Sequence, residues 1–393
     1  MSRLTPKTQD FSSGQKIFIF PDGRYEISEA IELPENAILG TEIPGEEGVY
    51  FLHTQFGAYV IRTAEGQEPS VGIIYFHNSQ AYPDRLSLIS NVTGDVEETY
   101  DSLDDLDPIT ALSMHPDGFI YASRRSSVPR MSLYLFNHEA VQQWEWHDAG
   151  STQSGQNCKL FIDDNGDIYY SILVDALTVK VARIDDTGNE VWVREYTGLV
   201  SAPSTYYYGA TCAKHGNTLW VAARRTIHII DATTGDEIDS IATPTLAASA
   251  ALTQDGTFWV GLGWGDLTPY TQDNGTIIEG DYVIIGDNHD ITCVSSYGEY
   301  MYVSGTDWTT DMGVYTTRVS LSGDILWEDT IDVYLYGSYN TFITPSGEIF
   351  STFETYGEEF PIIVAYTPDG ERLPGFEPVE LDYFTGNMDY LEF

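Results

Sequence analysis

Two pairs of neighbouring arginines are the side chains best suited to bind an anion. Arg124-Arg125 and Arg224-Arg225 follow two apolar segments at nearly the same place, in a chain with thirteen arginines. A guanidinium group holds a carboxylate or a sulfate through two parallel hydrogen bonds, so these pairs could grip an acidic glycan. They could instead form ion pairs with the acidic residues around them. Both interpretations stay open, and all four arginines are candidate binding residues.

Two tyrosine-rich segments are the second group of candidates. They read STYYYGA at 204–210 and YLYGSYN at 334–340, and we predict both to be loops between structural repeats. Tyrosine together with Ser, Gly and Asn is typical of adaptable recognition surfaces, because the ring gives contact area and the hydroxyl a hydrogen bond. Ordinary core packing is the alternative. The candidate ligand- or partner-binding residues are Tyr206, Tyr207, Tyr208, Tyr334, Tyr336 and Tyr339.

The residue pattern gives little indication of a catalytic site or a metal site. The chain has no G-x-S-x-G, and we interpret His115 and His215 as turn residues rather than bases. The run Asp163-Asp164-Asn165-Gly166-Asp167 superficially resembles a calcium loop, but it lacks the alternating ligands and the distal Glu. An Asx-rich β-turn is the simpler interpretation. We therefore expect no catalytic residues, no metal site and no cofactor.

The elements that position these residues are revealed by an internal repeat. Short apolar segments, each after a Gly-containing turn, carry an aromatic residue every 39 to 51 positions. One four-stranded propeller blade needs a period of this length. The aligned aromatics are Tyr75, Tyr121, Tyr169, Trp220, Trp259, Tyr302 and Phe350. The sequence therefore predicts an all-β fold, a seven-bladed β-propeller of four-stranded antiparallel blades.

A second signal follows most of these aromatics. Extended runs meet at a polar turn in 183–192, 229–238, 318–327 and 365–373, where Gly would supply a positive φ. The D-x-x-T-G-x-x-x-W type of hairpin, best seen at Asp185–Trp192 and Asp231–Gly235, resembles the repeat of quinoprotein-type (PQQ-like) propellers. This resemblance covers most of residues 57–378 and implies the fold. It does not imply the cofactor, since the chain lacks an adjacent cysteine pair and seven blades differ from the eight expected of quinoprotein dehydrogenases.

Outside the repeat lie two terminal segments. Residues 17–28, with Pro21-Asp22-Gly23 between apolar strands, predict a β-hairpin. We expect residues 57–378 to form the propeller. Residues 1–56 either supply the outer strand that closes the ring or form a docking arm. Residues 379–393 form a C-terminal tail, for which the same two alternatives stay open.

The charge balance is strongly acidic. Sixty Asp and Glu stand against 18 Lys and Arg, which gives a net charge of −42. Such a surface repels itself at ordinary salt, whereas molar salt shortens the Debye length to about 3 Å. We infer adaptation to high salt; an acidic mesophilic protein with a cationic partner is the alternative. Nucleic acid is a poor partner for this surface.

The predicted function is non-enzymatic recognition or a structural role. The N-terminal residues have no apolar core of a signal peptide, and no apolar run is long enough to insert into a membrane. Our leading hypothesis is a virion component of a haloarchaeal virus (spike, turret or tail protein), assembled in the host cytoplasm. Its partners would be other virion or assembly proteins, or a host surface-layer protein or glycan. The alternatives are a glycan-active propeller lyase or hydrolase, and a cytoplasmic protein-binding scaffold of a halophile.

Salt dependence tests the interpretation of the charge. Because carboxylate repulsion is screened at about 1 M salt and much less at about 0.1 M, we expect the midpoint of thermal unfolding to fall when sodium chloride is lowered between these values. Circular dichroism melts in a sodium chloride series measure it. A midpoint that stays constant over the series would contradict adaptation to salt.

Overall fold

The structure is a computed structural model that describes parts of the chain. The described residues are 17–19, 25–27, 38–42, 49–54, 57–62, 71–79, 82–90, 96–100, 109–115, 118–124, 131–136, 142–147, 160–163, 165–174, 177–199, 210–263, 265–286, 289–308, 313–331, 335–343, 347–355, 362–373, 379–380 and 385–392. All secondary structure assigned in them is β-strand. They contain no helix that is long and apolar enough to cross a membrane.

The chain divides into two compact units. The first comprises Met1–Gly72 with Leu391–Phe393, and the second Ile73–Tyr390. In the first unit, β1 (Ile17–Ile19) pairs antiparallel with β2 (Tyr25–Ile27), which confirms the hairpin predicted for 17–28. A separate sheet has the order β3-β4-β5, with bounds Ile38–Glu42, Val49–Thr54 and Gly57–Arg62.

The second unit is a succession of antiparallel sheets, which we number along the chain. Sheet 1 has the order β34-β6-β7-β8, with bounds Thr385–Glu392, Val71–Ser79, Tyr82–Ser90 and Val96–Tyr100. Sheet 2 contains β9 to β12, with bounds Ile109–His115, Gly118–Arg124, Met131–Phe136 and Gln142–His147. Sheet 3 contains β13 to β16, with bounds Leu160–Ile162, Ile168–Leu173, Thr178–Ile184 and Glu190–Thr197.

The later sheets repeat the pattern with one variation. Sheet 4 contains β17 to β20: Ala210–His215, Thr218–Ala223, Thr226–Asp231 and Glu237–Ala242. Sheet 5 has a divided outer strand and contains β21 to β25: Ala247–Leu252, Phe258–Leu262, Asp266–Asp273, Thr276–Glu279 and Val283–Ile284. Sheet 6 contains β26 to β29: His289–Tyr297, Tyr300–Asp307, Gly313–Ser320 and Ile325–Ile331. Sheet 7 contains β30 to β33: Leu335–Ile343, Ile349–Thr355, Ile362–Tyr366 and Val379–Glu380.

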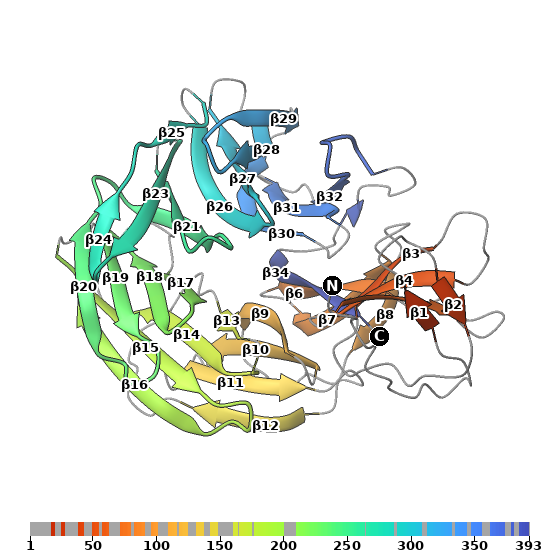
Figure 1. Cartoon of the computed structure of the whole chain (residues 1–393), viewed down its shortest axis with the longest axis horizontal. Helices are drawn as coiled ribbons and strands as arrows, with labels where there is room; N and C mark the ends of the chain where they lie inside the picture. The colour runs from red at the N-terminus through yellow and green to blue at the C-terminus, as the bar shows by residue number, and fades with distance from the viewer. Residues whose placement is uncertain are drawn as a thin grey trace, which may run out of the picture. The chain divides into compact units, whose positions relative to one another are not determined.

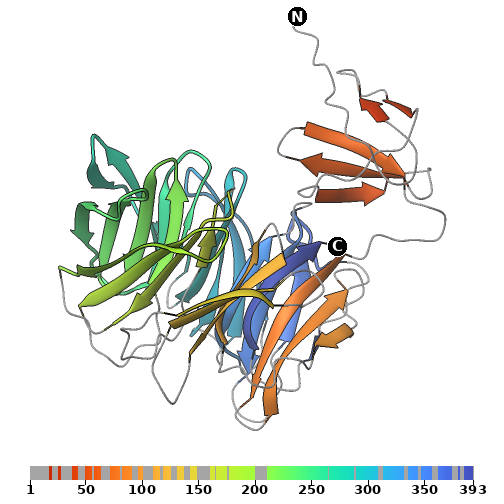
Figure 2. The same ribbon diagram turned by 90° about the horizontal axis from the view of Figure 1, so that it is seen from below.

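Successive sheets contact one another through their first strands. The contacts β9–β13, β13–β17, β17–β21, β21–β26 and β26–β30 join sheets 2 to 7 in chain order, and Figure 1 shows these sheets following one another along an arc. Figure 2 shows them from the side, with the twist expected of antiparallel strands. Up-and-down four-stranded sheets that pack in sequence are the architecture of a β-propeller. The predicted all-β fold of four-stranded antiparallel sheets is therefore confirmed.

The recurring aromatics mark one position in every sheet. Each of the seven residues aligned from the sequence lies on the second strand of a different sheet, β6, β10, β14, β18, β22, β27 or β31. Of these, Tyr169, Trp220, Trp259, Tyr302 and Phe350 are buried. The repeat detected in the sequence is therefore a repeat of sheets.

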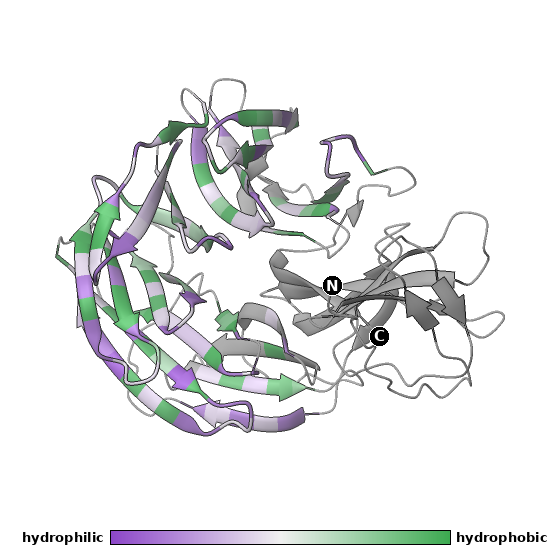
Figure 3. Ribbon diagram, viewed as in Figure 1, coloured by the Kyte–Doolittle hydropathy of each residue, from purple (hydrophilic) through white to green (hydrophobic). Residues whose placement is uncertain are grey.

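The hydrophobic core lies in the seams between neighbouring sheets. Side chains alternate along a strand, so Ile168 and Tyr170 pack toward sheet 2 while Tyr169 packs toward sheet 4. Further buried clusters fill the seams between sheets 4 and 5, 5 and 6, and 6 and 7. Figure 3 shows hydrophilic and hydrophobic residues alternating on the outer strand β16, which has one side toward solvent.

A tryptophan on the outer strand of one sheet clamps the polar turn of the next. Trp192 of sheet 3 donates its indole N–H to Ala232 O of sheet 4 at 3.1 Å, and Gly235 of that turn faces the ring. Trp144 with Gly188, and Trp327 with Gly370, repeat this contact between sheets 2 and 3 and between sheets 6 and 7, with Asp186 O and Pro368 O as acceptors. Each of these glycines has a positive φ, as predicted for the hairpin turns.

Of the seams between sheets 2 and 7 that the structure describes, those on either side of sheet 5 lack the indole. Asp239 stands opposite Ile229 in sheet 4, the register position that Trp192 occupies opposite Arg183 in sheet 3. The Asp239 carboxylate accepts a hydrogen bond from Ile277 N of sheet 5 at 2.9 Å. Between sheets 5 and 6, Val283 takes the place beside the turn glycine Gly323. The clamp is therefore replaced on both sides of sheet 5.

The strand that completes sheet 1 comes from the C-terminal part of the chain. The sequence-based hypothesis let residues 1–56 supply a closing outer strand, but β34 occupies the first position, beside β6. Strands β3 to β5 pair among themselves instead, so they do not supply the strand beside β6. The first compact unit extends along the chain to Gly72.

The clamp predicts a difference between two glycine substitutions. Gly235 and Gly216 both have a positive φ, but a Cβ at Gly235 would lie 2.9 Å from the Trp192 ring, whereas a Cβ at Gly216 meets nothing within 4 Å. We expect Gly216→Ala to cost about 1–2 kcal/mol of backbone strain, and Gly235→Ala to cost about 1–3 kcal/mol more from overpacking. Urea denaturation measures both free energies of unfolding. Equal losses would contradict the clamp.

Candidate functional site

The arginine pair of sheet 4 forms a tight turn between β18 and β19. Ala223 pairs with Thr226, so Arg224 and Arg225 are the two loop residues. Arg224 has a φ of 57°, a left-handed conformation that costs an L-residue roughly 1–2 kcal/mol and that Gly or Asn adopts more readily. Such local strain at a side chain with binding chemistry is a reason to look for a function there.

Arg225 is used within the protein. Its guanidinium donates to Pro244 O at 2.8 Å and to Thr243 O at 3.4 Å, on the segment that leads to sheet 5. The contact is with backbone carbonyls, so neither a ligand nor an acidic side chain occupies these donors. The other pair is less well described: Arg124 is the last residue of β10, and Arg125 lies outside the described residues.

The tyrosine candidates are described only in part. Tyr206, Tyr207, Tyr208 and Tyr334 lie outside the described residues. The segment with the first three ends at Ala210, which pairs with Ala223 beside the arginine turn. The prediction of a loop at 334–340 is wrong for Tyr336 and Tyr339, because both belong to β30. That strand pairs with β31 along its length, with irregularities near Gly337 and Tyr339, and backbone pairing overrides the turn-like Gly and Ser content.

A small cavity lies between sheets 3 and 4 at the arginine turn. Its apolar wall includes Leu173, Leu177 and Val179, and its free space of about 10 Å³ has room for at most one water molecule. The polar side chains that line it are those of Thr178, Arg224, Thr226 and His228.

His228 is the fully buried ionisable group of this cavity. Its Nδ1 lies 2.7 Å from the Glu237 carboxylate, and its Nε2 is buried with no hydrogen-bond partner in the structure. Burial lowers the pKa of His228 below its ordinary value, and the Glu237 carboxylate, which raises it, compensates only in part. The imidazole is therefore neutral near pH 7, with Nδ1–H donated to Glu237 and Nε2 left as an acceptor.

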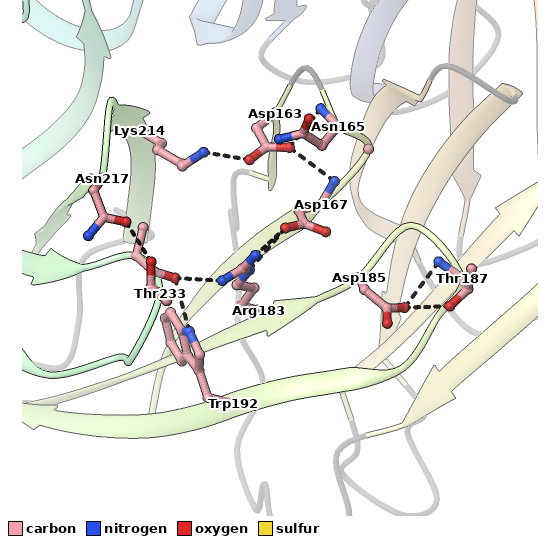
Figure 4. Close-up of polar contacts among 12 residues, drawn as sticks. Asp163, Asn165, Asp167, Arg183, Asp185, Thr187, Trp192, Lys214, Asn217 and Thr233 are labelled. Carbon is pink, nitrogen blue, oxygen red and sulfur yellow. Dashed lines mark hydrogen bonds and ion pairs between the residues drawn. The ribbon is translucent and has the colours of Figure 1, made fainter.

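The acidic run at 163–167 is a structural turn. Asp163 Oδ1 accepts the backbone N–H groups of Asn165 and Asp167, and its Oδ2 lies 2.5 Å from the Lys214 ammonium of sheet 4. Figure 4 shows Asp167 beside it, paired with Arg183 at 2.5 Å. This agrees with the predicted Asx-rich turn. Among the described residues no cluster of His, Cys, Asp and Glu could hold a metal ion.

His115 and His215, which the sequence analysis interprets as turn residues, contact the neighbouring sheets. His115, at the end of β9, is buried, and its Nε2 lies 3.1 Å from Gly166 O of sheet 3. His215, at the end of β17, has its ring beside Gly256 of sheet 5. Both are therefore strand-end residues that contact the next sheet.

Exposed apolar side chains gather on the outer strands of sheets 4 to 6. We call Ile238, Ile278, Tyr282, Ile284, Ile325 and Leu326 the apolar rim; each is at least 43% exposed. Figure 3 shows hydrophobic segments on β25 and β29. The rim spans the two seams without a tryptophan clamp, and Ile238 contacts the Gly275 turn of sheet 5. Exposed carboxylates alternate with it, at Asp236, Glu279, Asp281 and Asp324.

Sequence reasoning missed both His228 and the apolar rim. His228 lies in the run TIHII, which looks like an ordinary buried strand, and only the turn brings it near Arg224. The rim was detectable in part, since the runs around Asp239 and Val283 lack the tryptophan found at Trp144, Trp192 and Trp327.

Comparisons with known proteins concern the fold. No family model matches the sequence, and no curated protein matches it. A protein of unknown function from Bacteroides caccae has a similar structure, with 10% identity and a TM-score of 0.49, over 82% of this chain and 99% of the other. BamB from Moraxella catarrhalis has 13% identity and a TM-score of 0.45, over 81% of this chain and 87% of the other.

The neutral state of His228 predicts a pH effect. Because the pKa of His228 is lower in the folded protein than the ordinary 6.5, its contribution is fully present above about pH 6.5 and is lost as the pH falls toward the folded pKa. We expect the free energy of unfolding to fall less between about pH 7 and 5 in His228→Gln than in the wild type. Urea denaturation in halide-free buffer measures it. Parallel pH profiles would contradict the assignment.

Proposed function

We propose that this chain is a non-enzymatic recognition propeller that binds a protein partner at the apolar rim. The observation that carries the proposal is the set of exposed Ile, Leu and Tyr side chains on, or between, the outer strands of three consecutive sheets. Exposed apolar groups that cluster and are bordered by polar ones mark interaction sites on folded proteins.

We propose further that the seven sheets close into a ring of seven blades. Seven aligned aromatics lie on the second strands of sheets 1 to 7, and β34 beside β6 brings the last part of the chain into sheet 1. In a ring of this kind the outer strands form the circumference. A partner can therefore reach the rim from the side of the ring.

The chemistry of the partner follows from the charges around the rim. The exposed carboxylates of Asp236, Glu279, Asp281 and Asp324 lie beside the apolar side chains in the sequence, and the whole chain carries −42. Complementary interfaces pair a negative patch with a positive one. We therefore propose a partner surface that combines aromatic or aliphatic groups with Lys or Arg.

The absence of catalysis is part of the proposal and has its own support. Several described side chains with reactive chemistry contact the neighbouring sheet instead: His115 contacts Gly166, Lys214 pairs with Asp163, and Arg183 donates to Ala232 O. A virion role, with a host surface protein or glycan as partner, is a narrower version of the same proposal. A protein-binding scaffold is the alternative. The apolar rim would be the partner-binding surface in either case.

Selection from a displayed random peptide library tests the proposal. We expect the selected peptides to combine apolar residues with Lys or Arg, and Tyr282→Ser or Ile278→Ser to weaken their binding at least about tenfold, as hot-spot residues do. Val191→Ser is the matched control, since Val191 is 45% exposed and Ile278 46%, but Val191 lies on sheet 3. Failure to select such peptides, or equal loss in all three variants, would contradict the proposal.

A further inference from the structure

The dipeptide Asn-Gly occurs twice in the chain, each time directly after an aspartate. The two copies are Asn165-Gly166, between β13 and β14, and Asn274-Gly275, between β23 and β24. Both asparagines are exposed to solvent. The same tripeptide, Asp-Asn-Gly, therefore stands in two different turns, and any difference in its reactivity in the folded protein comes from the fold around it.

Asn-Gly is the dipeptide in which a backbone nitrogen most readily attacks a side chain. The glycine nitrogen bonds to Cγ of the asparagine, and the side-chain amide takes the proton of the glycine N–H and leaves as ammonia. The product is a cyclic imide, which water opens at either of its two carbonyl groups. Opening gives aspartate or isoaspartate, and in isoaspartate the main chain is longer by a methylene group. Glycine favours the attack because it has no Cβ in the way and its backbone rotates freely.

The first copy is held by hydrogen bonds at the reacting atoms. Gly166 N, the nucleophile, donates to Asp163 O at 2.8 Å, and Asn165 N donates to Asp163 Oδ1 at 3.0 Å. Gly166 is buried, and its carbonyl oxygen lies 3.1 Å from Nε2 of His115 in sheet 2. Ring closure at Asn165 therefore requires these bonds to break where two sheets meet.

The second copy is held at fewer points. Asn274 and Gly275 have φ values of 50° and 86°, as in the two-residue hairpin turn that Asn-Gly prefers. The Asn274 side-chain amide donates to Asp273 Oδ1 at 2.8 Å, but none of the hydrogen bonds in the described part of the chain uses the N–H of Gly275. A Cβ at Gly275 would meet only Ile238, at 3.5 Å. The nucleophile of this copy is therefore not engaged elsewhere.

We propose that Asn274 is a site of spontaneous deamidation in the folded protein, and that the fold protects Asn165 from the same reaction. The chain itself and water are the reactants. Protection follows because the reactive population of a turn falls with the free energy needed to open it. The turn at Asn165 has several bonds to open before Gly166 N reaches Cγ, whereas the hairpin end at Asn274 needs only a rotation of two exposed residues.

The reaction changes the seam between sheets 4 and 5, one of those without a tryptophan clamp. A two-residue turn cannot take a longer main chain without disturbing the pairing of β23 with β24. Ile277 of β24 is buried, and its backbone N–H donates to Asp239 Oδ2 of sheet 4 at 2.9 Å. Ile238, also of sheet 4, lies against Gly275. Isoaspartate at Asn274 therefore loosens the outer edge of sheet 5 and adds a negative charge to it.

Peptide mapping by mass spectrometry compares both sites in one sample. The full-length protein is incubated folded, and in parallel in urea that unfolds it, and peptides with Asn, Asp and isoaspartate are separated at intervals. We expect Asn274 to react at least about tenfold faster than Asn165 in the folded protein, because several hydrogen bonds hold the latter turn. In urea the two rates should be similar, since only the shared tripeptide remains. Equal rates in the folded protein, or an Asn274 that reacts only in urea, would overturn the proposal.

Hydrogen exchange measures the consequence for the seam. We expect protection of the Ile277 amide to fall at least about tenfold as isoaspartate accumulates. The control is Asn274→Gly, which suits the φ of 50° and has no side-chain amide to lose, so it should keep this protection through the same incubation. Equal loss in both proteins, or full protection in the isoaspartate form, would contradict the link between the turn and the seam.

Discussion

The seam between neighbouring sheets is the constraint on which the rest of this fold depends. A four-stranded sheet cannot bury both of its faces alone, so each one relies on the sheets before and after it. In three described seams the same device sets the spacing at the outer edge, an indole that lies on a glycine and donates to a carbonyl of the same turn. The glycine is required for two reasons, a positive φ and the absence of a Cβ under the ring. Because the tryptophan and the glycine belong to different sheets, this contact fixes the position of each sheet against the next one along the chain.

The acidic chain places its scarce cations at these seams. Arg183 of sheet 3 donates to Ala232 O of sheet 4, the carbonyl that also accepts the Trp192 indole. Arg318 of sheet 6 donates in the same way to Pro368 O of sheet 7, beside Trp327. Lys214 reaches back to Asp163. Three of the 18 Lys and Arg residues thus form contacts between sheets, while sixty Asp and Glu set the negative charge of the chain. The departure from this pattern on both sides of sheet 5 is what leaves apolar side chains exposed there.

Much of the fold could be predicted because its determinants are local. The turn glycines at 188, 235, 323 and 370 and the aromatics on second strands repeat at a period that a sheet imposes. The sites could not be predicted in the same way, because they depend on register. His228 meets Glu237 across a hairpin with a β-bulge between Ile229 and Ile230, and no spacing rule shows that Arg224 borders the same cavity. Tyr336 and Tyr339 misled the prediction because their neighbours Gly337 and Ser338 suit a loop, while pairing with β31 decides the conformation.

The place of β34 beside β6 has a consequence for biosynthesis. Ser79 ends β6 and Thr385 begins β34, so 305 residues of chain lie between the two paired strands. At a translation rate of about 5–20 residues per second, the inner edge of β6 waits roughly 15 to 60 s for its neighbour. Sheets 2 to 7 pair strands that are close in the chain and can form as they emerge from the ribosome, whereas sheet 1 is the last to be completed. During that interval β6 presents unpaired backbone groups, which makes it the part of the nascent chain with the greatest need of protection from intermolecular strand pairing.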